Sequence, residues 1–221
     1  MRTLSLPLAL TARISPVVVL AAAGWALTSG PATKPATHEE SAPQSAAESP
    51  SGTATAAPTK RYAAAPAPCG SIGAATIKSL VPGAKTAGKE IPSTDAALRR
   101  TCSWNALKGF DYRWLDVSFE ITESDQAAAK SFKENVADKS GGGPVPGVGD
   151  AGYSVVNLST EDKQQTREGV VMIQASNALV TVTYNGSDFE SKKAPSTDEI
   201  NKGAIKAAKE AVAALESGQK T

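Results

Sequence analysis

The two cysteines of the chain, Cys69 and Cys102, are the residues whose chemistry is most readily inferred from the sequence. They follow an N-terminal segment of secretory type, and exported chains enter an oxidising environment in which paired thiols form disulfides. The sequence therefore predicts one disulfide, and a pair of buried free thiols is the alternative. Trp104 follows Cys102 by two residues, so in an extended strand both side chains point to one face and share one core.

The sequence after Cys69 contains no histidine and no cysteine other than Cys102. The only histidine is His38, whereas Ser-His-Asp and Cys-His catalysis and a His/Cys zinc site all need one within the fold. Asp116 and Glu120 would share one strand face about 13 Å apart, beyond the carboxylate spacing of glycosidases, roughly 5 to 9.5 Å. No phosphate-binding or dinucleotide-binding fingerprint is present. We therefore assign no catalytic residue, no metal ligand and no cofactor.

A candidate binding face is formed by Tyr112, Trp114 and Asp116 in one predicted strand. These residues alternate with the apolar positions of that strand, so they point away from the core, where aromatic side chains can bind a sugar or a protein partner. The alternative is that a helix or a loop covers them. A second candidate is a loop that mixes stiff prolines with permissive glycines, and its candidate functional residues are Gly147, Gly149 and Asp150.

The first 30 residues are typical of a signal peptide or an N-terminal anchor. The segment from Ile14 to Leu27 holds about 14 mostly apolar residues, fewer than the roughly 20 that span a bilayer. Ala21-Ala22-Ala23 fits a signal-peptidase site, and Thr28-Ser29-Gly30 is the alternative site, which favours cleavage over an uncleaved anchor. Leu20 to Gly24 also resembles a bacterial lipobox, but Trp25 occupies the position of the lipid-bearing cysteine. The sequence thus predicts export without lipidation, with membrane contact only through this segment.

The composition changes after this segment. Residues 31–68 are rich in Ala, Pro, Ser and Thr and contain no Val, Ile, Leu, Met, Phe or Trp. Such a segment buries too little apolar surface to offset its ordering entropy, so it is predicted to be a disordered linker. A single folded domain is predicted at 69–216, and 217–221 are predicted to be a flexible tail.

The folded domain is predicted to be α+β, with an antiparallel β-sheet of about five strands, three helices packed on one face of it, and one disulfide. Capping residues and period-2 or period-3.6 patterns place the elements, and residues 84–95 between them are predicted to be a loop. The predicted helices are 71–80, 125–139 and 196–215, and the predicted strands are 99–105, 112–122, 151–158, 166–175 and 178–184.

Three short motifs carry a resemblance to a known family. They are Cys69 before a short helix, Cys102-Ser103-Trp104, and the segment from Pro146 to Ala151 before a strand. In these the chain resembles the actinobacterial exported lipoproteins of unknown function, which are similar to the extracytoplasmic sensor domains of some mycobacterial serine/threonine kinases. The resemblance implies a cell-envelope α+β domain without an established activity. The chain departs from the family pattern at Trp25.

The charge of the chain bears on whether its partner is a nucleic acid. The formal net charge is +1, and the near-neutral, mixed surface lacks the basic footprint of a nucleic-acid-binding protein. We therefore expect an extracytoplasmic, secreted or N-terminally anchored module that is not an enzyme and that binds or senses an envelope protein or glycan. The alternative is an envelope hydrolase or transferase that uses only carboxylates and Tyr or Lys.

Overall fold

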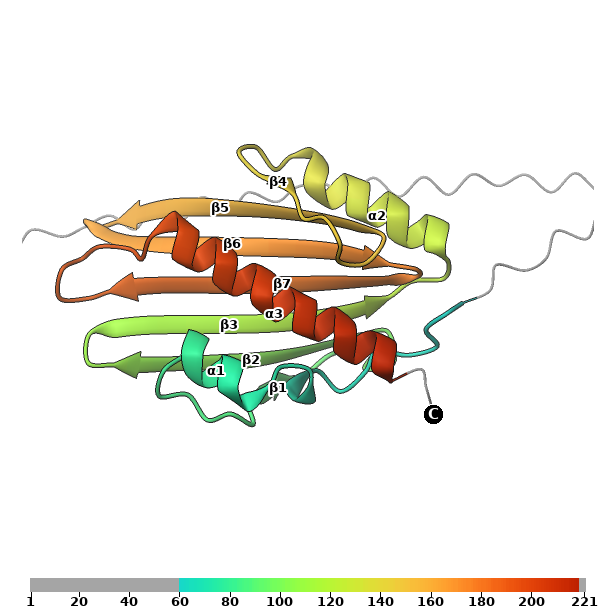
Figure 1. Cartoon of the computed structure of the whole chain (residues 1–221), viewed down its shortest axis with the longest axis horizontal. Coiled ribbons are helices and arrows are strands. Elements are labelled where there is room, and N and C mark those ends of the chain that lie inside the picture. Colours follow the sequence, from blue (N-terminus) through green and yellow to red (C-terminus); the bar gives the residue numbers. More distant parts are fainter. Residues whose placement is uncertain (1–59, 219–221) are drawn as a thin grey trace, which may run out of the picture. The chain divides into compact units, whose positions relative to one another are not determined.

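The computed structural model describes residues 60–218, and in this part three α-helices accompany one antiparallel sheet of seven strands (Figure 1). The predicted α+β class and antiparallel sheet are confirmed. The strand order across the sheet is β1-β2-β3-β7-β6-β5-β4. The strands are β1 (Lys89–Ile91), β2 (Arg99–Lys108), β3 (Asp111–Ile121), β4 (Gly143–Pro144), β5 (Ala151–Glu161), β6 (Gln164–Ala175) and β7 (Ala178–Asp188), and the helices are α1 (Ala74–Leu80), α2 (Asp125–Ala137) and α3 (Thr197–Ser217).

The predicted count of about five strands is wrong, because the sheet has seven. The five predicted strands all form, and each of the hairpin strands β2, β5 and β7 runs three or four residues further than its pattern indicated. The two additional strands are β1 and β4, which have three and two residues and lie at the two edges of the sheet. Elements this short cannot show the alternation of polar and apolar residues on which strand prediction rests.

Helix α3 lies across one face of the sheet and forms the main core with it (Figure 1). The side-chain oxygen of Ser196 accepts a hydrogen bond from the backbone N–H of Glu199 at 3.1 Å, which caps the first turn. The carboxylate of Glu199 binds Arg113 instead of completing a capping box. The apolar stripe predicted for this helix is buried, namely Ile200, Ala204, Ala208, Val212 and Leu215.

Helix α2 packs on the opposite face of the sheet, so the expectation that all helices share one face is wrong. It contacts β6 and β7, and Met172 and Leu179 are buried there although they alternate with the residues that face α3. Ala128 of the helix is fully buried outside the main core cluster. The apolar stripe of a helix indicates which side of the helix is covered, but it does not indicate which face of the sheet the helix packs on.

The predicted disulfide between Cys69 and Cys102 is confirmed, with an S–S distance of 1.98 Å and a Cα–Cα distance of 5.1 Å. Trp104 lies on the same face of β2 as Cys102 and is almost fully buried. Its indole N–H donates a hydrogen bond to the backbone oxygen of Thr86 at 3.1 Å. The disulfide therefore joins the segment before α1 to the central part of β2.

Packing begins ahead of Cys69, because Tyr62 is fully buried. The fully buried side chain of Asn177, in the turn between β6 and β7, holds the backbone at this point. Its oxygen accepts from the N–H of Tyr62 at 2.8 Å, and its amide nitrogen donates to the carbonyl oxygens of Tyr62 and Thr122 at 2.9 and 3.1 Å. The sequence indicates Asn177 only as a turn residue.

The predicted export segment lies outside the described residues, together with Trp25, His38 and most of the predicted linker. Between residues 60 and 218, no helix combines the length and the apolar character needed to cross a membrane.

Candidate binding site

Aromatic side chains from two separate segments gather where the β2–β3 hairpin and the C-terminal end of β7 meet. The rings of Tyr112 and Trp114 in β3 make an edge contact, with centroids 6.4 Å apart, and the ring of Phe189 lies 6.0 Å from that of Tyr112. The backbone N–H of Phe189 donates to the carbonyl oxygen of Phe110 at 2.9 Å, which fixes the two segments together.

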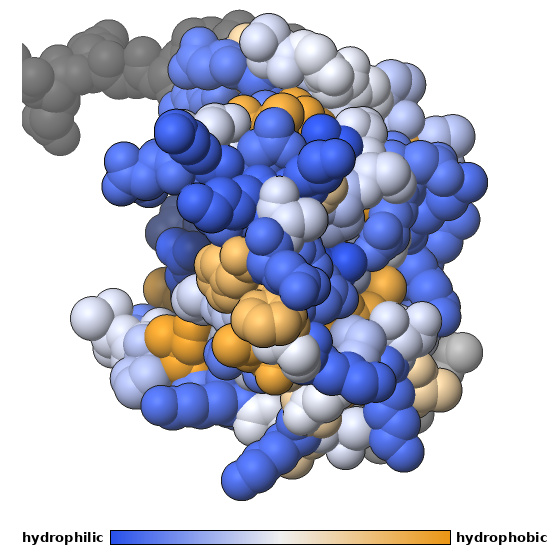
Figure 2. All heavy atoms as spheres, turned by 90° about the vertical axis from the view of Figure 1, so that its left-hand side faces the viewer, coloured by the Kyte–Doolittle hydropathy of each residue, from blue (hydrophilic) through white to orange (hydrophobic). Residues whose placement is uncertain are grey.

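These side chains and their apolar neighbours are partly exposed to solvent. The exposed fractions are 58% for Leu107, 56% for Phe110, 47% for Phe189 and 36% for Trp114, and Tyr112 is half-buried among them. Figure 2 shows hydrophobic side chains gathered in the middle of this end of the molecule, with hydrophilic residues around them. We call this surface the aromatic end, formed by Leu107, Phe110, Tyr112, Trp114 and Phe189.

Asp116 gives the aromatic end a polar border. Its carboxylate accepts a hydrogen bond from the indole N–H of Trp114 at 2.6 Å, which orients the ring. Burial and the negative charge of Asp116 both raise the pKa of Tyr112. Across the sheet Asp116 pairs in register with Ser103, which is buried, and with Thr183, which is partly exposed. The structure thus brings the three residues of the predicted binding face together, and their binding of a ligand stays a prediction.

Arg113 anchors the start of β3 from the opposite face of the sheet. Its guanidinium pairs with the carboxylates of Asp111 and, at 2.9 Å, of Glu199 in α3. The Arg113 side chain is nearly buried, whereas those of Asp111 and Glu199 are 42% and 49% exposed, so these ion pairs lie at the surface, where they link the strand to α3. From the alternating pattern we expect the residues that share a strand face with Arg113 to point into the core, with Arg113 itself as the exception. Its ion pair with Glu199, 86 positions away, could not be identified from the sequence.

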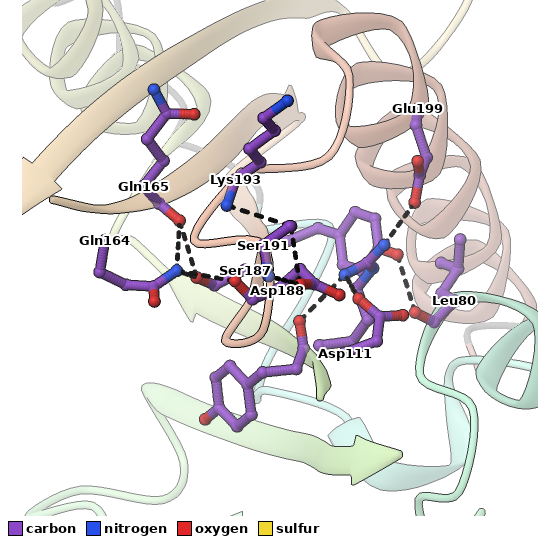
Figure 3. A network of polar contacts seen from close by, with 12 residues as sticks. Leu80, Asp111, Gln164, Gln165, Ser187, Asp188, Ser191, Lys193 and Glu199 are labelled. Carbon is purple, nitrogen blue, oxygen red and sulfur yellow. Dashed lines mark hydrogen bonds and ion pairs between the residues drawn. The ribbon is translucent and has the colours of Figure 1, made fainter. Parts of the chain in front are cut away.

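A second set of hydrogen bonds fixes the segment that carries Phe189 (Figure 3). The carboxylate of Asp188 accepts from the backbone N–H and the hydroxyl of Ser191 at 2.6 and 2.7 Å, and these bonds lower its pKa. The side-chain amide of Gln164 donates to the hydroxyl of Ser187 at 2.7 Å and to the carbonyl oxygen of Asp188 at 3.0 Å. The ring of Phe189 is therefore presented from a hydrogen-bonded turn.

Raising the pH from 10 to 12 is expected to destabilise the domain through Tyr184, whose hydroxyl donates to the carbonyl oxygen of Leu80 at 2.7 Å. Burial raises the pKa of this phenol to about 12, from an ordinary value of 10.0. Because the folded state has the higher pKa, the stabilisation is complete below pH 10 and is lost as the pH rises through 12. The expected loss is on the order of 2 kcal/mol.

Urea unfolding at the two pH values measures this loss, with Tyr184→Phe as the comparison. The variant retains Tyr62 and Tyr112, whose pKa values burial also raises, so it should lose less stability than the native protein over the same pH range. An identical pH dependence of stability in both proteins would show that ionisation of Tyr184 does not cause the loss.

The candidate loop lies at the other end of β7, next to the β6–β7 turn. The carboxylate of Asp150 accepts from the backbone N–H of Ser176 at 2.6 Å. Gly149 has a φ of +60°, and a Cβ there would lie 2.5 Å from the carbonyl oxygen of Gln174. Gly147 also has a positive φ, in open space. In the structure these residues shape and fasten the turn, and the loop is not brought together with the aromatic end.

Sequence reasoning missed Leu107, Phe110 and Phe189 as part of the aromatic end. Leu107 falls beyond the predicted end of β2, Phe110 lies in a turn, and Phe189 follows the predicted end of β7 by several residues. An apolar residue in a turn is the available signal, since a large side chain there has no neighbouring strand residue to cover it.

The sequence matches no family model, and no curated protein matches it either. One similar solved structure is that of the extracellular domain of PknH from Mycobacterium tuberculosis, with a TM-score of 0.31 and 14% identity over 54% of this chain and 64% of that one. Another is a structure from Bacteroides thetaiotaomicron, with a TM-score of 0.25 and 9% identity over 50% of this chain and 49% of that one. The chain thus spans less than two thirds of either structure, and similarity at this level carries no functional argument.

Proposed function

We propose that this domain is a non-catalytic binding module of the cell envelope and that it binds its partner at the aromatic end. The observation that carries the proposal is the exposed cluster of Tyr112, Trp114 and Phe189, with the Trp114 indole oriented by Asp116. Exposed rings held in a fixed orientation bind at low entropic cost, because little side-chain freedom is lost on contact. The partner is an envelope protein or a glycan.

The disulfide supports an extracytoplasmic location. Cys69 and Cys102 are bonded to each other, and structural disulfides persist in oxidising compartments and are rare in the cytosol. A binding role is favoured over carboxylate catalysis by the engagement of Asp116 with the Trp114 indole. The carboxylate of Glu120, four residues further along the same strand face, is too distant to act with it in glycoside hydrolysis.

The test is retention of envelope components on the immobilised full chain, with glycans and proteins analysed separately. Trp114→Ala should lower retention of the bound component by about tenfold or more, as expected for an aromatic residue central to an interface. The matched control is Leu98→Ala, which truncates a side chain that is 46% exposed just before the opposite end of β2. Equal retention by the native chain and both variants would contradict the proposed site.

A further inference from the structure

The edge of strand β2 that faces away from β3 is unpaired along half of the strand, and we call it the free edge. Strand β1 pairs only with the three residues from Thr101 to Ser103. From Trp104 to Lys108, β2 pairs with β3 on one side, and the described residues contribute no strand on the other. An unpaired stretch of strand presents backbone N–H and C=O groups that an extended chain can pair with.

The hairpin register identifies the backbone groups that point outward. Lys108 and Asp111 flank the two-residue turn between β2 and β3, and residues that flank such a turn pair with each other through their backbones. Backbone direction alternates along an antiparallel strand, so the N–H and C=O groups of Asn105 and Leu107 point away from β3. Two adjacent outward positions allow an added strand to form a short ladder.

A pocket of about 420 Å³ lies along this free edge, between β2 and the segment that precedes β1. Lys85 and Lys89 are its only charged lining residues, and neither has an ion-pair partner among the described residues. Leu107 adds an exposed apolar side chain. Ser103 also lines the pocket, and its buried hydroxyl has no hydrogen-bond partner among the described residues. The pocket therefore combines positive charge with unpaired backbone.

We propose that the free edge of β2 binds an extended acidic peptide, which adds to the sheet as a further strand. The backbones of Asn105 and Leu107 pair with the peptide, and Lys85 and Lys89 bind its carboxylates. Alternate residues of an added strand point to opposite faces, so the preferred sequence alternates acidic and apolar residues. The inference rests on the proposed binding role and names a partner class, and its site adjoins the aromatic end, with which it shares Leu107.

The same charges disfavour a second copy of this chain as the occupant. Two β2 edges that paired with each other would bring Lys85 and Lys89 of both copies close together, and like charges facing each other across an interface oppose association. Strand β1 pairs with the first half of β2 and so prevents a second chain from pairing there. The charged residues Lys89 and Glu90 in β1 disfavour pairing at the outer edge of β1 itself. The second half of β2 has no such cover, and this is where the pocket lies.

Fluorescence anisotropy on the full chain tests the proposal with two labelled hexapeptides, acetyl-Val-Glu-Val-Glu-Val-Glu-amide and its counterpart with Lys in place of Glu. We expect the acidic peptide to bind and the basic one to bind at least about tenfold more weakly. Asn105→Pro should weaken binding of the acidic peptide by about tenfold or more, because proline removes an outward N–H at a position where an edge strand tolerates it. Lys85→Glu combined with Lys89→Glu should invert the preference between the peptides.

Two control variants separate this inference from the proposed function. Lys206→Glu combined with Lys209→Glu makes the same charge change on the exposed side of α3. This double variant and Phe189→Ala, at the end of β7 on the far side of β3 from the free edge, should each leave the peptide affinity within about twofold. Hydrogen exchange on the native chain provides a measurement that does not depend on the folding of a variant. The peptide should slow exchange at the N–H groups of Asn105 and Leu107.

Equal affinity for the two peptides, or unchanged exchange at both N–H groups, would overturn the inference. So would a concentration-dependent dimer that Asn105→Pro abolishes, because a second copy would then occupy the edge. If peptide binding fails while Trp114→Ala still abolishes retention of an envelope component, the inference falls and the proposed function stands. If the peptide binds and Trp114→Ala leaves retention unchanged, the aromatic end is not the binding site.

Discussion

Reduction of the Cys69–Cys102 disulfide is expected to lower the free energy of unfolding by about 3 to 4 kcal/mol. The bond joins residues 33 positions apart, and opening a loop of that size restores this much conformational freedom to the unfolded chain in the chain-entropy model. For a domain of this length the melting temperature should fall by about 10 °C. Urea unfolding and thermal melting of the full chain, with and without reductant, measure both quantities.

The double variant Cys69→Ala with Cys102→Ala is the control for effects of the reductant. It should match the reduced protein or be slightly less stable, because Cys102 is fully buried and the smaller side chain leaves space beside Trp104. The variant should also be insensitive to reductant. A melting temperature that is the same for the oxidised, reduced and double-variant proteins would show that the bond contributes nothing to stability.

The disulfide and the long strands could be predicted because their signals are local. Residues 112–122 alternate between apolar and polar positions, and the structure buries Leu115, Val117, Phe119 and Ile121 as that pattern predicts. Ser196 caps α3 as predicted, and of the two residues that the sequence offers as a cap for α2, Thr122 and Ser124, it is Ser124 that caps the helix. A cap requires only a side-chain oxygen and a backbone N–H a few residues away.

The remaining features depend on contacts between distant segments. The turn residue Asn177 hydrogen-bonds the backbone of Tyr62, which is 115 positions away, and Arg113 pairs with Glu199, 86 positions away. Phe189 joins Tyr112 only because β7 pairs with β3 in one particular register. No periodicity in a single sequence specifies such a pairing. The sequence could therefore predict the residues of the binding face that lie in β3, but not those that other segments add to it.

Gly88→Val is expected to destabilise the domain by about 2 to 5 kcal/mol. Gly88 precedes β1 with a φ of +65°, and a Cβ built there would lie 2.6 Å from the sulfur of Cys102 and 2.6 Å from the indole nitrogen of Trp104. A β-branched residue in this left-handed conformation costs about 1 to 2 kcal/mol. Displacing a disulfide sulfur and a buried indole adds the larger cost of overpacking, about 1 to 3 kcal/mol.

Gly109→Val separates backbone strain from steric overlap. Gly109 has nearly the same φ, +64°, but a Cβ there meets no atom within 4 Å, so this variant should lose only about 1 to 2 kcal/mol. Urea unfolding of both variants measures the difference, and near-UV circular dichroism should show an altered Trp104 environment in Gly88→Val alone. Equal losses in the two variants would mean that β1 moves aside without cost. The packing of Gly88 against Trp104 would then not hold β1 at the sheet edge. Gly88 and Lys89, which line the pocket beside β2, would then not be fixed in position.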